Sequence, residues 1–196
     1  MTNNAHVSNR AYNSSNSISR ITRQLSPRLA AAAVGLAAAG IAVGFIQYQH
    51  RSGVLEAHVP GTSAWAQQLI VAAAACALYG VARWRHGRRF GMRSGRLLLL
   101  APLGRSAAAR LMATMRQVSW RSAAALPPLV LIGYSCWRVG EQVTGGLDPN
   151  FNANAWGGPT YLGAMACHYL DISLIIAVSA WLLDRILLGP AAGPGA

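Results

Sequence analysis

Lysine is absent from this 196-residue chain and acidic residues are scarce: all 17 basic residues are arginine, and only five residues are Asp or Glu. Charged residues make up 11% of the chain, whereas soluble globular domains carry about 25%. This shortage excludes an ordinary soluble domain. The 53% share of apolar residues excludes a disordered chain, and three cysteines are too few for a disulfide scaffold. The composition therefore indicates a small integral membrane protein.

Signatures of soluble enzymes are also missing. The sequence contains no glycine-rich phosphate loop, HExxH, GxSxG or Walker motif. It has no Cys-x-x-Cys, which disfavours a quinone-linked disulfide oxidoreductase. A zinc site needs at least three convergent ligands, and a haem pair needs a second histidine within the membrane besides His168. We therefore expect no metal and no cofactor.

Four apolar runs are long enough, or nearly so, to cross the ~30 Å hydrocarbon core as helices of about 20 residues. They cover residues 29–48, 65–82, 118–137 and 160–183. The third run is the weakest, because it reaches spanning length only if Arg121 extends its side chain toward the membrane interface. The sequence thus predicts an all-α integral membrane protein with four transmembrane helices.

The distribution of arginine predicts the orientation of these helices. Residues 1–28 carry four arginines and residues 83–121 carry ten, and neither segment contains an acidic residue. Arginine collects on the cytoplasmic side, so both segments are expected there, with the N-terminus and the C-terminus inside. The expected organisation is a disordered basic cytoplasmic tail (1–28), a transmembrane domain (29–188) with an inner loop (83–117), and a flexible C-terminal tail (189–196).

Abundant Ala, Arg and Gly without Lys suggests a GC-rich genome, so we expect the inner (plasma) membrane of a GC-rich bacterium. The alternative is the mitochondrial inner membrane, because a tail rich in Arg and Ser without acidic residues is also typical of transit peptides. A cleaved secretory signal is disfavoured, since the first apolar run is long enough to remain as an anchor.

The inner loop contains a predicted amphipathic helix over residues 105–118, between the second and third spans. Arg105, Arg110 and Arg116 fall on one half of the helical wheel, and Leu111 and Met115 fall on the other. Such a helix can lie in the membrane plane, with its arginines contacting anionic lipid headgroups. The simpler alternative is that these arginines only fix topology. No nucleic-acid-binding module accompanies the charge, so no nucleic-acid partner is expected.

The fourth span carries the polar residues most relevant to function. Asp171 lies about eleven residues into this span, where a carboxylate is costly. His168 lies three residues earlier on the same face, and Tyr161 lies near that face toward the outer surface. These three residues are the candidate proton or substrate site.

The alternative is a structural clamp, in which a neutral Asp171 donates to backbone carbonyls of the third span. Pro127 and Pro128 lack N–H groups, so the carbonyls of Ala123 and Ala124 lose their helical donors.

Small residues predict close helix packing in the first span. Gly40 and Gly44 form a GxxxG pattern, and we expect this face to pack against the second span, which offers Ala73, Ala77 and Gly80. The turn-rich segment 145–159 is either a capped connection or a lid containing Trp156 over an outward-facing cavity. Its alternating Asp and Asn residues lack the spacing of a calcium loop.

These observations favour a non-enzymatic accessory, resistance or immunity-type membrane protein, with the lipid bilayer and a partner membrane subunit as its expected partners. The first alternative is a proton-coupled small-molecule transporter or permease component that uses His168 and Asp171. The second is an intramembrane enzyme that uses the same pair as acid and base.

Overall fold

The structure is a computed structural model that describes residues 25–90 and 103–188. The predictions for most of the basic tail, for part of the inner loop and for the C-terminal tail lie outside these residues. The described helices are α2 (Pro27–Gln49), α3 (Trp65–Phe90), α4 (Arg105–Met115), α5 (Trp120–Gly145), α6 (Pro149–Asn152) and α7 (Tyr161–Ile186). The described residues form no strand, only one β-bridge between Leu25 and Gly104. The all-helical prediction is confirmed for this part of the chain.

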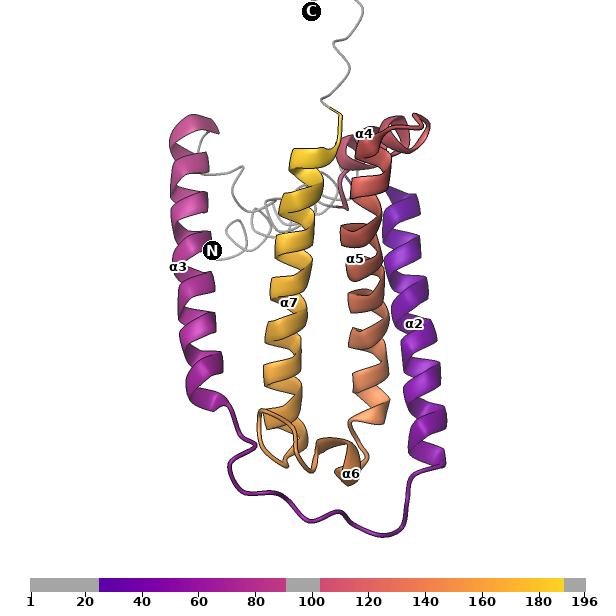
Figure 1. Cartoon of the computed structure of the whole chain (residues 1–196), viewed down its shortest axis with the longest axis vertical. Coiled ribbons are helices and arrows are strands. Elements are labelled where there is room, and N and C mark those ends of the chain that lie inside the picture. Colours follow the sequence, from indigo (N-terminus) through magenta and orange to yellow (C-terminus); the bar gives the residue numbers. More distant parts are fainter. Residues whose placement is uncertain (1–24, 91–102, 189–196) are drawn as a thin grey trace, which may run out of the picture.

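Four long helices run side by side, with α5 between α2 and α7 and with α3 on the far side of α7 (Figure 1). We call the end that holds α6 and residues 50–64 the outer end, and the end that holds α4 the inner end. Among the described residues, three helices are long and apolar enough to cross a membrane, namely α2, residues 65–85 of α3, and α7. At ~1.5 Å per residue, helices of 21–26 residues measure about 31–39 Å. These three helices agree with the predicted spans in length and in apolar composition.

Helix α5 is as long as α3 and α7 but is not among those three apolar helices. Its outer end differs from the prediction, because the helix continues past Trp137 to Gly145. Arg138 and Glu141 are therefore helical residues and not part of a connection. The two side chains form an ion pair one turn apart, which adds a little to the stability of the helix there.

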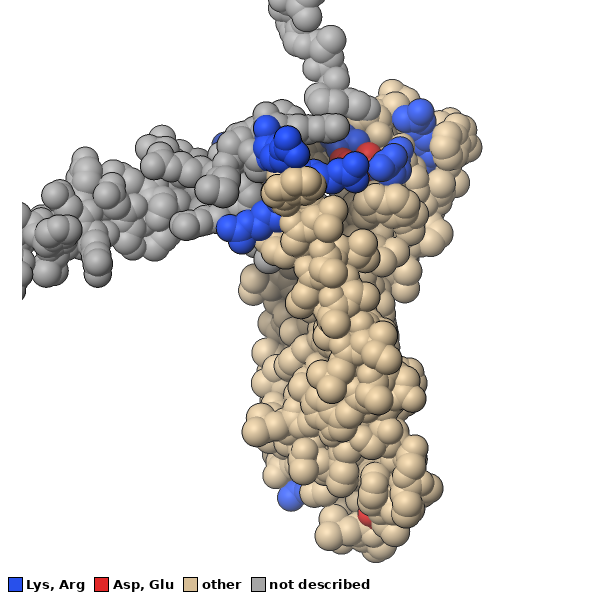
Figure 2. All heavy atoms as spheres, turned by 90° about the vertical axis from the view of Figure 1, so that its left-hand side faces the viewer, with Lys and Arg blue, Asp and Glu red and all other residues tan. Residues whose placement is uncertain are grey.

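Charged side chains gather at the two ends of the molecule, and the surface between them is almost free of charge on the side that α3 occupies (Figure 2). Exposed apolar side chains cover this surface, and on α3 they include Leu69, Ile70 and Leu78. A broad apolar belt between charged ends is the pattern of a protein surrounded by lipid.

Glycines bring α2 and α5 into backbone contact. A Cβ atom on Gly40 would overlap the carbonyl oxygen of Trp137, and one on Gly140 would overlap the carbonyl oxygen of Ala37. The expectation that the GxxxG face packs against α3 is therefore wrong, since Gly80 of α3 has open space around it. The face was identified correctly, but its partner is α5, which offers a glycine of its own at the crossing.

The inner end is held together by α4. Leu111 and Met115 pack against a small cluster formed by Ala125, Leu183 and Leu187. The apolar face of α4 thus covers the ends of α5 and α7. The helix ends at Met115, before the predicted end at Val118, and Val118 is fully exposed.

Candidate functional site

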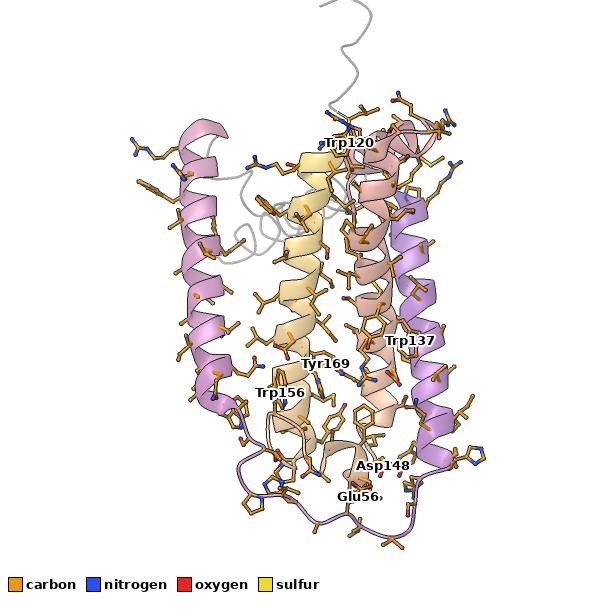
Figure 3. The ribbon with its side chains drawn as sticks, in the orientation of Figure 1. Glu56, Trp120, Trp137, Asp148, Trp156 and Tyr169 are labelled. Carbon is orange, nitrogen blue, oxygen red and sulfur yellow. The ribbon has the colours of Figure 1, made fainter. Side chains whose placement is uncertain are left out.

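A polar cavity of about 480 Å³ lies at the outer end of the bundle. Its walls come from α5, α7, the segment around α6 and the α2–α3 connection. The lining residues are Glu56, Arg138, Asn150, Phe151, Asn154, Ala155, Trp156, His168 and Asp171. Figure 3 shows Glu56 and Trp156 at this end of the bundle, opposite Trp120. The volume falls within the range of about 300–1,000 Å³ that is typical of small-molecule sites.

The two outer connections are joined to each other by hydrogen bonds. Asn150 accepts from the backbone N–H of Glu56 (2.8 Å) and donates to the carbonyl of Val54 (2.8 Å). Asn154 accepts from the N–H of Val59 (2.9 Å). Because amide side chains satisfy an otherwise irregular backbone, the two segments form a single ordered cover.

Further bonds attach this cover to α3. The N–H of Ala64 donates to the carbonyl of Trp156 (2.7 Å), and the indole N–H of Trp65 donates to the carbonyl of Gly157 (3.0 Å). Asp148 caps α6 by accepting from Asn150 (2.9 Å). The alternating polar residues of this segment therefore build the cover. The described residues contain no group of three Asp, Glu, His or Cys side chains that could hold a metal ion.

Asp171 and His168 both line the cavity from α7, as the shared helical face predicts. Neither a hydrogen bond nor a salt bridge joins the two described side chains; instead, Asp171 accepts a hydrogen bond of 3.0 Å from the side-chain amide of Gln68. Gln68 lies in the first turn of α3 and is 6% exposed. Its amide links α3 to α7 beside the cavity, and the sequence analysis did not single it out.

Tyr161 does not line the cavity. Its hydroxyl group donates to the carbonyl of Val143 (3.3 Å) in the last turn of α5. The predicted line of Tyr161, His168 and Asp171 is therefore only partly assembled: the histidine and the aspartate reach the cavity, and the tyrosine joins α7 to α5.

The proposed clamp between Asp171 and the carbonyls of Ala123 and Ala124 is not what the structure shows. The neighbouring Ala125 packs against Leu183, which lies twelve residues beyond Asp171 along α7. At ~1.5 Å per residue this separation is about 18 Å. Asp171 lies at the level of the outer cavity, and its hydrogen-bond partner comes from α3.

Arg138 is the cavity residue that sequence reasoning missed. Its guanidinium group pairs with Glu141 and lies over the ring of Phe151, with 5.2 Å from Cζ to the ring centroid. Glu141 is 3% exposed and also accepts from the side-chain amide of Gln47 on α2 (2.9 Å). The available signal was the spacing of an arginine and a glutamate one helical turn apart. The sequence analysis missed it because the predicted third span ended where these charged residues begin.

The arginines of the inner end are partly used inside the protein. Arg110 donates to the carboxylate of Asp184 (2.5 Å) and to the carbonyls of Asp184 (2.8 Å), Leu187 (3.3 Å) and Leu188 (2.7 Å) at the end of α7. Arg105 donates to the carbonyl of Leu25 (3.2 Å) and lines an apolar groove of about 370 Å³ between α2 and α4. The lipid-headgroup prediction therefore depends mainly on Arg116 and on the remaining donors of Arg105.

No family model, curated protein or solved structure matches this chain. The case for a function therefore rests on the geometry of the outer cavity.

Proposed function

We propose that this chain is a non-enzymatic multi-pass membrane protein that binds a small polar solute in its outer cavity, as an accessory, resistance or immunity-type protein does. The observation that carries the proposal is the cavity itself. It combines charged and titratable side chains from two packed helices with an ordered cover that two separate connections build. A few convergent polar groups in a pre-formed concavity are the usual features of a small-molecule site.

The proposal includes four membrane crossings, with both termini and the arginine-rich segments on the cytoplasmic side. Helix α5 supports the fourth crossing, because it lies between two apolar spans and has the length of a span. Its one buried carboxylate, Glu141, is paired with Arg138, which lowers the cost of placing both near lipid. Helix α4 would then lie at the inner membrane surface, and Arg116 would face the headgroups.

A second candidate is a transporter component that uses His168 and Asp171. It is favoured by the position of α3, which stands apart from the other helices and is linked to Asp171 through Gln68 (Figure 1). A helix held by few contacts moves at low free-energy cost, and such motion is what alternating exposure of a site requires.

Solute binding is testable by thermal unfolding of the purified full chain in detergent. The probes are choline, glycerol 3-phosphate, glycine betaine and xylitol, which represent cations, anions, zwitterions and neutral solutes. We expect at least one probe to raise the Tm by about 5 °C at saturating concentration, since binding to the folded state alone stabilises it by mass action. Ala155→Phe, which fills the cavity from its wall, should abolish the shift.

The matched control is Ala74→Phe on the exposed surface of α3, which should keep the shift of the wild-type chain. The proposal fails if none of the four probes moves the Tm, or if the cavity variant Ala155→Phe responds as the control does.

A further inference from the structure

We infer that the solute bound in the outer cavity is an organic cation of the ammonium class. This inference rests on the proposed function and adds the charge of the ligand to it. Three features of the cavity carry it: the balance of charge, the free hydrogen-bonding capacity of Asp171, and an aromatic ring on the wall.

The balance of charge in the cavity is negative. The positive charge of Arg138 is already engaged by Glu141, which is buried behind it. The carboxylates of Asp171 and Glu56 remain, together with the imidazole of His168. No salt bridge among the described residues joins either carboxylate to an arginine or to this histidine. An anionic solute would meet two uncompensated carboxylates, whereas a cation would neutralise one or both.

Asp171 has acceptor capacity left for a ligand. An ionised carboxylate offers about four lone-pair positions, and its hydrogen bond from Gln68 uses one of them. The amide of Gln68 orients the carboxylate without neutralising it. Asp171 is only half-buried on α7 and lines the cavity, so a ligand can reach its remaining positions.

The aromatic wall favours an ammonium group. Phe151 already faces the guanidinium group of Arg138, so that its ring is engaged. Trp156 is 58% exposed and lines the same cavity, and no described guanidinium group lies over its indole ring. The face of an indole is the strongest of the natural cation–π acceptors, and it attracts ammonium groups whether or not they carry N–H donors.

The decisive comparison is between choline and 3,3-dimethylbutan-1-ol, which has nearly the same shape but carries carbon in place of the charged nitrogen. Isothermal titration of the full chain in detergent should give a Kd for choline at least tenfold lower than that for the neutral alcohol. Benzyltrimethylammonium and butylammonium should also bind. The inference is overturned if all three cations bind no better than the neutral alcohol.

Two substitutions assign the binding to the cavity. Asp171→Asn keeps the shape and the bond to Gln68 but removes the charge, and it should weaken choline binding at least tenfold. Asp184→Asn makes the same change at the other end of α7 and should leave the affinity for choline within twofold of the wild-type value. Equal effects of the two substitutions would contradict the assignment.

A second pair of variants keeps the test decisive if Asp171→Asn does not fold. Glu56 lies in an exposed connection and Trp156 lies in the cover. The variants Glu56→Gln and Trp156→Leu should each weaken choline binding several-fold. If glycerol 3-phosphate or xylitol binds and is lost in Ala155→Phe while the cations fail, the proposed function stands and the cation inference is wrong. If no solute of any charge binds, both are wrong.

Discussion

Replacing Gly140 by alanine is expected to destabilise the bundle by about 1–3 kcal/mol, because a single added methyl group forces α2 and α5 apart. The Cβ atom would overlap the carbonyl group of Ala37 and approach the backbone of Ile41 to 3.0 Å. Backbone atoms of a packed helix cannot move aside as a side chain can. The free energy of unfolding, measured in mixed micelles by circular dichroism, should fall accordingly.

Gly35→Ala on α2 provides the matched control. No atom from outside its own helix lies within 4 Å of the added Cβ, so this substitution meets open space. Alanine at such a helical site should leave stability unchanged or raise it by about 0.5–1 kcal/mol, since it restricts the unfolded chain. The two glycine substitutions should thus have opposite signs. Equal stabilities of Gly140→Ala and Gly35→Ala would show that α2 and α5 are not in backbone contact.

Arg138→Met is expected to cost about 3–5 kcal/mol, because it leaves Glu141 as an uncompensated buried charge. Glu141 would keep only the hydrogen bond from Gln47, and Phe151 would lose the guanidinium group above its ring. The same unfolding measurement tests this loss. Most of it should return in the double variant Arg138→Met/Glu141→Gln, in which no buried charge remains.

The ion pair between Arg110 and Asp184 at the inner end, whose carboxylate is exposed, gives the comparison for this prediction. Asp184 has a side chain that is 67% exposed, so Asp184→Asn should change stability by less than about 1 kcal/mol. A double variant as unstable as Arg138→Met alone would argue against a role for charge. A loss no larger than that of Asp184→Asn would show that Glu141 is solvated.

Predictions from the sequence were most accurate for features that depend on a single helix. Apolar runs predicted four spanning helices, and three of these runs lie in helices that are long and apolar enough to cross a membrane. The spacing of His168 and Asp171 placed both residues on the cavity side of α7. The end of α5 was misplaced because the predicted span ended before a charged residue, Arg138. A charge limits an apolar run but does not end a helix, and α5 continues to Gly145 with Arg138 and Glu141 paired one turn apart.

Features that depend on contacts between two helices could not be predicted from the sequence. The GxxxG pattern identifies a face that permits close approach, but it does not say which helix approaches. The partner proved to be α5, whose Gly140 was not considered. Likewise, the alternating Asn150 and Asn154 were noticed in the outer segment, but their backbone partners lie more than ninety residues earlier in the chain.

The position of α5 in the membrane is the claim on which the outer cavity and its ligand depend. It is tested most directly by labelling single cysteines in sealed, oriented vesicles with a membrane-impermeant maleimide. The sites are Arg116→Cys and Leu147→Cys, which flank α5 and lie before and after it in the chain. The background carries alanine at the three native cysteines, Cys76, Cys136 and Cys167, all of which are free.

Four crossings predict that cysteines 116 and 147 react from opposite sides of the vesicle. A cysteine at Gly53, which is exposed in the α2–α3 connection, should react from the same side as cysteine 147, since both lie at the outer end. Reaction of cysteines 116 and 147 from the same side would mean that α5 does not cross the membrane, and it would contradict the four-span account.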